Sequence, residues 1–236
     1  MSATCVISSR MESTRFPGKP LALINGREMI LWVAESCKKA VGLNNVIIAT
    51  DSKELIDCVT GAGYNSIIID TKRCGNCSDA TAEAIRYVDS DIIIDVQGDE
   101  PLIRPEDIQK IIEFKRNKHD HVINAYAYEK DGENKNTIKV ESHNINGDLI
   151  TMSRLPIPAG ARIFKRQVCV YGFYKNQLLE LYGYDKGKSE LEKHEDIHIL
   201  RCVNNYQKVF MIKLDGVYQA VDVPGDIKKV EDIING

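Results

Sequence analysis

The sequence has no apolar run of about 18 residues or more, so we expect no transmembrane helix and no membrane insertion. It has no block of Lys and Arg, and its formal net charge is only −3, which gives no support for a nucleic-acid partner. The N-terminal segment 1–15 lacks the basic and then apolar region of a secretion signal. The seven cysteines are an odd number, which without such a signal favours free thiols and a cytoplasmic location.

With 236 residues, of which 43% are hydrophobic, residues 1–236 are expected to form a single domain with a substantial core. Through the first hundred residues, short β-branched runs alternate with segments of helical spacing. The expected strands are 4–8, 45–50, 66–70 and 91–96, and the expected helices are 28–40, 52–62, 78–88 and 104–116. Strands that are apolar on both faces, separated by helices, predict a Rossmann-like α/β fold with a mostly parallel sheet.

The middle of the chain has a different pattern, with alternating or β-branched runs separated by Gly, Asn and Asp. These runs are 121–128, 137–141 and 148–152. They predict a smaller antiparallel lobe inserted at about 121–175. The remaining expected elements are a strand at 168–174, helices at 176–182 and 189–203, a strand at 209–214 and a last helix after Pro224.

The segment 9–20, with the sequence SRMESTRFPGKP, follows the first expected strand directly. Ligands bind at the carboxyl ends of the strands in such sheets, so this loop belongs to the binding edge. It carries three cations with small residues between them: Arg10, Arg15 and Lys19, with Ser13, Thr14 and Gly18. Small residues let backbone N–H groups approach an anion that Arg and Lys neutralise, which suits a triphosphate. The alternative interpretation is a solvated basic loop.

Two carboxylates are expected to face the same edge. Asp99 follows an apolar strand and Gly98, and Asp222 stands just before Pro224 and the last helix. A carboxylate that faces a polyphosphate needs a cation between them, and Mg²⁺ is bound by one or two carboxylates plus phosphate oxygens. The two residues are therefore our candidate metal ligands, although Asp222 could instead cap the helix that follows.

Several strings of this chain resemble the sugar-acid cytidylyltransferases, in particular the 3-deoxy-manno-octulosonate cytidylyltransferase family. The most specific are RMESTRFPGKP at 10–20 and VQGDEP at 96–101. Further matches follow in the same order over nearly the whole chain: ATD at 49–51, SR at 153–154, IP at 157–158, VYG at 170–172, LE at 191–192 and VDVPGD at 221–226.

The resemblance implies a fold of the nucleotide-diphospho-sugar transferase type and a homodimer with its contact on the later lobe. It implies that CTP is joined to a 2-keto sugar acid when the anomeric hydroxyl attacks the α-phosphorus and pyrophosphate leaves. By the same resemblance, Arg10, Ser13, Arg15 and Lys19 hold the triphosphate, Asp99 and Asp222 bind Mg²⁺, Gln97 lies beside the sugar, and Arg154 meets the sugar carboxylate. Arg10, Lys19, Asp99 and Asp222 are the expected catalytic residues.

The chain departs from the family pattern at several positions that surround the substrates. Ser78 lies where the family has a Ser-Gly-Thr-Glu-Arg loop near the nucleotide, and it is our candidate contact there. Gln167 replaces a histidine, and His198 falls where the family has a glutamate. Together with Tyr171, which could instead be a half-buried strand residue, these are expected to face the sugar acid. The sugar itself therefore stays open between 3-deoxy-manno-octulosonate, an amino derivative of it and a nonulosonate.

Two short motifs suggest other functions. Residues 194–198 match HExxH, whose two histidines would share a helix face and bind zinc, but no third ligand is evident. Cys74 and Cys77 form a CxxC pair, but a structural zinc site needs a second pair, so two free thiols are expected.

Two other functions remain possible at this level. One is a nucleotidyltransferase that acts on a sugar 1-phosphate, since the basic loop would be shared. The other is a nucleotide-binding regulatory protein, which would not need both Asp99 and Asp222.

Overall fold

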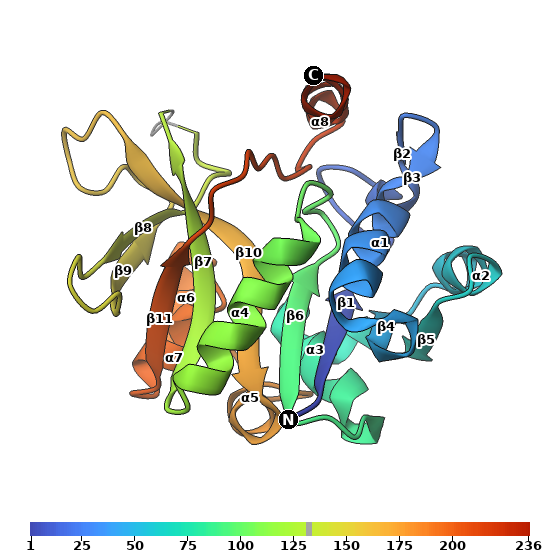
Figure 1. Cartoon of the computed structure of the whole chain (residues 1–236), viewed down its shortest axis with the longest axis horizontal. Helices are drawn as coiled ribbons and strands as arrows, with labels where there is room; N and C mark the ends of the chain where they lie inside the picture. Colours follow the sequence, from blue (N-terminus) through green and yellow to red (C-terminus); the bar gives the residue numbers. More distant parts are fainter. Residues whose placement is uncertain (131–133) are drawn as a thin grey trace.

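A mixed nine-stranded sheet organises the computed structural model of the protein, which describes residues 1–130 and 134–236 (Figure 1). The strand order is β11-β7-β10-β6-β1-β4-β5, and β8 and β9 are attached through β10. The strands are β1 (Ala3–Ser8), β4 (Val46–Thr50), β5 (Asn65–Ile68), β6 (Ile92–Gln97), β7 (His121–Glu129), β8 (Lys139–Ser142), β9 (Leu149–Ser153), β10 (Phe164–Tyr174) and β11 (Lys208–Lys213), and a separate hairpin joins β2 (Leu23–Ile24) and β3 (Arg27–Glu28).

Helices cover both faces of the sheet, as the two-sided apolar strands require. The helices are α1 (Met29–Val41), α2 (Lys53–Gly61), α3 (Cys77–Ala84), α4 (Pro105–Asn117), α5 (Lys175–Leu181), α6 (Glu190–Glu195), α7 (Leu200–Asn204) and α8 (Gly225–Asn235). One core packs α1, α2 and α4 against the sheet, and a second packs α3, α5 and α7 against the other face. Neighbouring residues of β1 alternate between them, since Ile7 belongs to the first core and Val6 to the second.

The predicted fold class is confirmed, because β1 pairs in parallel with both β4 and β6, and β4 pairs in parallel with β5. The predicted lobe at about 121–175 is more closely joined to this sheet than an independent insertion would be. Its long strand β10 runs antiparallel between β6 and β7 (Figure 1). The β8–β9 hairpin joins β10 through β8 and is bridged to β11 between Asp148 and Phe210. The alternating pattern of these segments indicated strands but not which strands they would pair with.

The predicted element boundaries hold to within a few residues, with two exceptions. The expected helix 78–88 ends at Ala84 and continues as a 3₁₀ turn over Ile85–Tyr87. The expected helix 189–203 is wrong, because α6 ends at Glu195 and Asp196 adopts a left-handed conformation with φ of 53°. The two histidines of the HExxH match therefore do not share a helix face.

The remaining sequence expectations about metals, thiols and membranes can also be compared with the structure. All seven cysteines are free, including Cys74 and Cys77. In the described residues, no three His, Cys, Asp or Glu side chains gather as a metal-binding group. Within those same residues, no helix is both long and apolar enough to cross a bilayer.

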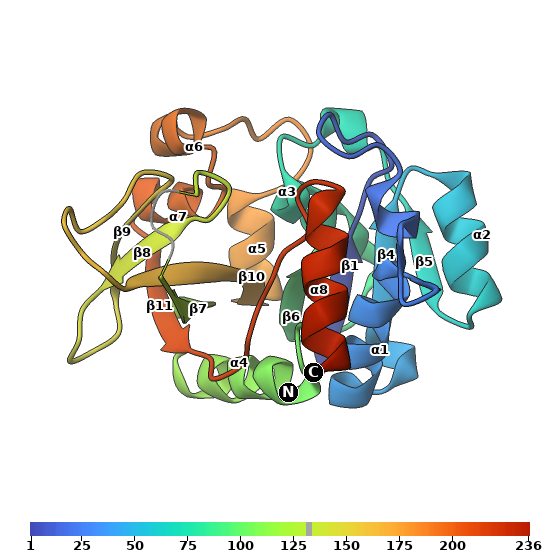
Figure 2. The same ribbon diagram turned by 90° about the horizontal axis from the view of Figure 1, so that it is seen from above.

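The C-terminal helix α8 holds the end of the chain against the N-terminal half (Figure 2). Val230 of α8 and Val221 pack with Ile24 and Met29 in a third, smaller core. The backbone N–H of Val221 also donates to the carbonyl oxygen of Asp99 at 3.0 Å. These contacts bring the C-terminal segment to the carboxyl end of β6.

One buried ion network ties α3 to α6 and α7. The Arg201 guanidinium contacts Asp79 and Glu192, both at 2.7 Å, and all three side chains are almost fully buried. Removing the cation would leave two buried carboxylates without their partner, which is far more costly than losing an exposed pair.

We therefore expect Arg201→Ala to lower the free energy of unfolding by about 3–5 kcal/mol, measured by urea denaturation. Lys193→Ala is the matched control, because Lys193 and Glu190 form a largely exposed pair that should contribute well under about 1 kcal/mol. Equal losses in the two variants would contradict this account of the buried network.

Candidate active site

Two cavities meet at the carboxyl ends of β1 and β6. The loop cavity, about 710 Å³, is lined mainly by residues 8–20. The inner cavity, about 380 Å³, lies toward β10 and the segment before α8. Arg15, Gln97 and Asp99 line both cavities, so the two form one continuous crevice.

The loop cavity is shaped by the turn chemistry of the basic loop. Gly18 has φ of 72°, which favours glycine, and its N–H donates to the carbonyl oxygen of Met11 at 3.1 Å. The Ser13 hydroxyl oxygen accepts from the N–H of Phe16 at 3.3 Å. The folded loop lines the cavity with Arg10, Ser13, Arg15 and Lys19, as the sequence predicts.

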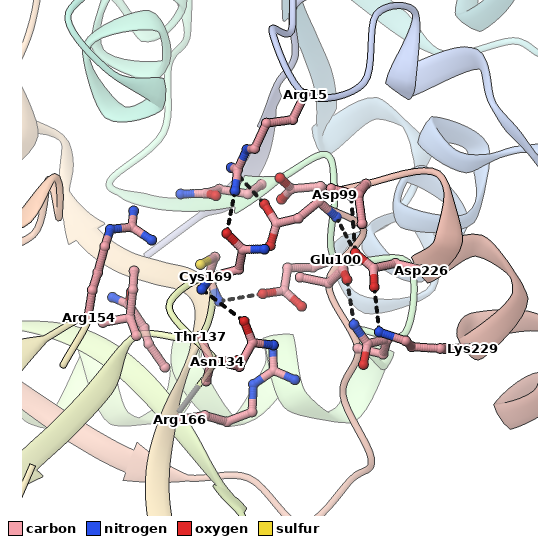
Figure 3. Close-up of a pocket in the computed structure, with 18 residues that line it drawn as sticks. Arg15, Asp99, Glu100, Asn134, Thr137, Arg154, Arg166, Cys169, Asp226 and Lys229 are labelled. Carbon is pink, nitrogen blue, oxygen red and sulfur yellow. Dashed lines mark hydrogen bonds and ion pairs between the residues drawn. The ribbon is translucent and has the colours of Figure 1, made fainter. Parts of the chain in front are cut away.

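The two candidate metal ligands are each paired with a cation of the basic loop. The Nζ of Lys19 lies 2.6 Å from the Asp99 carboxylate and donates to the carbonyl oxygen of Val221 at 3.0 Å. The guanidinium of Arg15 lies 2.9 Å from the Asp222 carboxylate (Figure 3). Segments about 80 and 200 residues apart in the sequence thus meet through opposite charges.

The pKa shifts show how strongly these charges influence one another. Burial works against the charged form of Lys19, but the Asp99 carboxylate outweighs burial and raises the pKa of Lys19. Burial raises the pKa of Asp222, and the negative charge of Asp99 raises it further. The charges of Arg15 and Lys19 oppose this shift, so the loop cations offset the repulsion between the two carboxylates.

The donor set at this point fits a magnesium ion. Asp99 and Asp222 supply hard carboxylate oxygens and both line the inner cavity. No three His, Cys, Asp or Glu side chains of the described residues are grouped so that they could hold a metal ion together, so phosphate oxygens and water would have to complete an octahedral shell. Mg²⁺ is usually bound in this way, through one or two carboxylates and the phosphates of a substrate.

The inner cavity is lined by the predicted acceptor-binding residues Gln97, Arg154 and Gln167, of which Arg154 is labelled in Figure 3. Arg154 follows β9, and its guanidinium is oriented by the carbonyl oxygens of Glu195 and Asp196, at 3.0 and 2.9 Å. This cation is fixed at the wall of the cavity, where an anionic group can reach it.

The sequence reasoning missed four charged residues of the inner cavity, Glu100, Arg166, Asp226 and Lys229. Of these, Glu100 and Arg166 are 1% and 6% exposed. Burial raises the pKa of Glu100 to about 7, although the positive charge of Arg166 opposes this shift. Glu100 stands next to Asp99 in the VQGDEP string, which was the one signal available for it. Arg166 lies within a strand, where no local pattern marks a buried charge.

Three predicted site residues do not reach the crevice. Ser78 was expected to contact the nucleotide, but its side chain is fully buried and its hydroxyl donates to Asp95 at 2.6 Å. Tyr171 and His198 were expected to face the sugar acid. Instead Tyr171 is fully buried, the two rings pack with centroids 4.8 Å apart, and neither residue lines either cavity. Burial also lowers the pKa of His198 to about 4, so it is neutral at pH 7.

Comparisons with known proteins agree with this geometry. The family model described as cytidylyltransferase matches residues 4–215. The 3-deoxy-manno-octulosonate cytidylyltransferase of Thermodesulfovibrio yellowstonii is 32% identical, over 100% of this chain and 99% of the relative. The mitochondrial 3-deoxy-manno-octulosonate cytidylyltransferase of Arabidopsis thaliana is 29% identical, over 97% of this chain and 82% of the relative.

Solved structures give the same result for the fold. A CMP:2-keto-3-deoxy-manno-octonic acid synthetase complexed with CTP superposes with a TM-score of 0.86 at 27% identity, over 100% of this chain and 99% of the other. The inositol-1-phosphate CTP transferase of T. maritima superposes with a TM-score of 0.72 at 16% identity, over 100% and 96%, and shares the fold.

The fold and the cation-lined crevice define a nucleotidyltransferase. More specifically, the chain belongs to the cytidylyltransferase family, and its full-length similarity places it among the 3-deoxy-manno-octulosonate cytidylyltransferases.

Ser78 and Asp95 form a buried hydrogen bond in place of the expected contact between Ser78 and the nucleotide, and the ionisation of Asp95 can be tested by varying the pH. Burial raises the pKa of Asp95 to about 6, partly opposed by hydrogen bonds from Ser78 and Thr81. A carboxyl group whose pKa is raised in the folded state stabilises the fold fully only below its pKa in the unfolded state, which is near 3.8. This contribution to the free energy of unfolding is lost as the pH rises through the folded-state pKa of about 6.

We expect Asp95→Asn, which cannot ionise, to gain stability relative to the unsubstituted protein between pH 4 and pH 7, by about 2 kcal/mol. The measurement is the difference between the two unfolding free energies across that range. A difference that does not change with pH, or that falls, would contradict the raised pKa.

Proposed function

We propose that the protein joins CTP to 3-deoxy-manno-octulosonate or a close 2-keto-3-deoxy sugar acid and releases pyrophosphate. The observation that carries the proposal is the crevice in which Lys19 and Arg15 meet Asp99 and Asp222. Such a pairing of cations and carboxylates suits a metal-bound triphosphate. The full-length similarity to 3-deoxy-manno-octulosonate cytidylyltransferases supports the choice of reaction.

The basic loop would bind the triphosphate. Arg10, Arg15 and Lys19 supply the neutralising charge, and the Ser13 hydroxyl can donate to a phosphate oxygen while its oxygen holds the loop turn. In transfers at phosphorus, positioning and charge neutralisation provide most of the catalysis. No covalent nucleophile of the protein is needed for an in-line attack by the sugar hydroxyl.

Asp99 and Asp222 would hold Mg²⁺ between the two cavities. Bound there, the ion would neutralise phosphate charge and favour the ionised form of the attacking hydroxyl. The residues have to exchange partners for this to happen, since each carboxylate is now paired with a loop cation. When the triphosphate draws Lys19 and Arg15 toward its own oxygens, both carboxylates become free to act as ligands.

The acceptor would lie in the inner cavity, with its carboxylate at Arg154 and its ring near Gln97 and Gln167. Arg154 can bind the carboxylate of an acid, and the full-length similarity to 3-deoxy-manno-octulosonate cytidylyltransferases favours an acid over the second candidate, a sugar 1-phosphate. The second candidate is supported by the fold shared with enzymes such as the inositol-1-phosphate CTP transferase. A regulatory protein that only binds a nucleotide would have no use for the inner cavity. An amino derivative or a nonulosonate remains an alternative acceptor.

We expect Asp99→Asn to lower turnover by at least about 100-fold, since it removes the carboxylate proposed to bind the metal. The measurement is pyrophosphate release with CTP, a sugar acid and Mg²⁺, with thermal unfolding recorded in parallel to show that the fold persists. The control is Asp232→Asn, a substitution at an exposed residue of α8. Near-normal turnover of the Asp99 variant would refute the metal site.

We also propose a homodimer that forms through the segment 121–175, in a cytoplasmic protein with free thiols. This segment carries large apolar side chains that are more than half exposed: Tyr128, Ile145, Ile150, Leu155 and Ile163. A group of this kind on one lobe suits a protein interface.

The double substitution of Ile145 and Ile150 by Asp should therefore convert a dimer into a monomer in sedimentation velocity experiments. Ile68→Asp is the control, because Ile68 is 72% exposed on β5, at the opposite edge of the sheet. A monomeric unsubstituted protein, or dissociation of the control variant alone, would contradict this interface.

A further inference from the structure

Three residues at one side of the crevice each have a buried polar side-chain atom with no hydrogen-bond partner among the described residues. These atoms are Oε2 of Glu100, Nε of Arg166 and Oε1 of Gln167. All three residues line the inner cavity, where the acceptor is proposed to bind. Buried polar groups are nearly always paired in proteins, so three unpaired atoms at one cavity call for an explanation.

Each of these side chains is fixed by another of its own atoms. The Oε1 of Glu100 accepts from the N–H of Cys169 at 3.0 Å, and the Nε2 of Gln167 donates to Asn124 at 2.8 Å. The Nη1 of Arg166 donates to the carbonyl oxygen of Tyr218. The three side chains are therefore held in place, while one polar atom of each has no hydrogen-bond partner among the described residues.

An irregularity in β10 creates this arrangement. The pairing of β10 with β7 shifts register between Val168 and Tyr171. Within the bulge, the N–H of Cys169 turns to Glu100, and the Nδ2 of Asn124 donates to the carbonyl oxygens of Val168 and Val170, at 3.1 and 2.9 Å. β-bulges often occur beside active sites, where they redirect side chains.

The side chains of Glu100 and Arg166 have opposite charges but do not contact each other as an ion pair. Glu100 and Arg166 are both buried and line the same cavity, yet no salt bridge forms between these two described residues. A purely structural pair would be expected to close to contact distance, because separated buried charges destabilise a fold. A gap between a fixed carboxylate and a fixed guanidinium is instead suited to a group that bridges them.

The chemistry of the three atoms selects the bridging group. Glu100 and Gln167 offer acceptors, and Arg166 offers a donor. A hydroxyl both donates and accepts, so it can satisfy a carboxylate and a guanidinium at once. An ammonium group could donate to Glu100 but would leave the Nε of Arg166 without an acceptor, and a second carboxylate could accept from Arg166 but would leave the Oε2 of Glu100 without a donor.

We propose that Glu100, Arg166 and Gln167 form a subsite that selects the acceptor by its neutral hydroxyl-bearing tail, in preference to an amino-substituted tail. This inference rests on the proposed function, since it assumes that a sugar acid occupies the inner cavity. It makes the three residues determinants of acceptor specificity and gives them no part in the transfer step.

The test compares two acceptors with the full-length protein in the pyrophosphate-release assay at saturating CTP. One is the eight-carbon acid 3-deoxy-manno-octulosonate, and the other is a six-carbon 2-keto-3-deoxy acid that lacks the two terminal hydroxyl-bearing carbons. Glu100→Gln should raise the KM for the eight-carbon acid by about tenfold or more and leave the KM for CTP within about twofold. The KM for the six-carbon acid should change by less than about threefold.

Asp95→Asn is the matched control, because Asp95 is also a fully buried carboxylate with a raised pKa but does not line the inner cavity. It should leave the KM for both acids unchanged. The double variant Glu100→Gln with Arg166→Gln should raise the KM for the eight-carbon acid by less than the product of the two single effects, since both residues bind the same hydroxyls.

Equal KM increases for the two acids, or loss of thermal stability with no change in KM, would show that Glu100 has only a structural role and would overturn the subsite. In the same assay, a lower KM of the unsubstituted protein for an amino-substituted eight-carbon acid than for 3-deoxy-manno-octulosonate would overturn it as well. An unsubstituted protein that releases no pyrophosphate with either acid would instead overturn the proposed function, and this inference with it.

Discussion

The crevice depends on two ion pairs, Lys19–Asp99 and Arg15–Asp222, which join the basic loop to the two carboxylates. Without the loop cations, Asp99 and Asp222 would face each other across a partly buried space, and Asp222 already has a raised pKa in part because of Asp99. The pairs therefore hold the proposed metal ligands and the proposed phosphate-binding cations in one place before any substrate is bound. A metal-bound triphosphate has the same distribution of charge, so it can take over both halves of this arrangement.

The central sheet determines where these four residues lie. β1 and β6 are neighbours and parallel, so the loop after β1 and the turn after β6 emerge at the same edge. The C-terminal segment lies at that edge because the N–H of Val221 donates to the carbonyl oxygen of Asp99 and because α8 packs in the third core. β10 then closes the other side of the crevice, and its bulge supplies the polar floor of the inner cavity.

Much of the fold and part of the site could be predicted from the sequence, because they follow from short-range patterns. Strands that are apolar on both faces predicted the parallel part of the sheet, and the positions of the basic loop and Asp99 after such strands predicted that they would meet. The pairing of β10 with β6 and β7 could not be predicted, since alternation does not specify a partner strand. Nor could the break at Asp196, because no Gly or Pro marks it.

The site residues that were misplaced share one physical cause. Ser78, Tyr171 and His198 were assigned by resemblance, but their burial is decided by tertiary packing against Asp95 and against each other. Glu100 and Arg166 were missed for the converse reason, since nothing local in a sequence shows that a charged side chain is buried beside a cavity. Burial of polar groups is thus the property that the structure adds to the sequence.

The most direct test of the central claim is a pyrophosphate-release assay with the purified protein, Mg²⁺, each nucleoside triphosphate and a panel of sugar acids and sugar 1-phosphates. Our account predicts release only with CTP and a 2-keto-3-deoxy sugar acid, with a new CMP-sugar detected in the same reaction. Release with a sugar 1-phosphate, or no release with any acid in the panel, would contradict it.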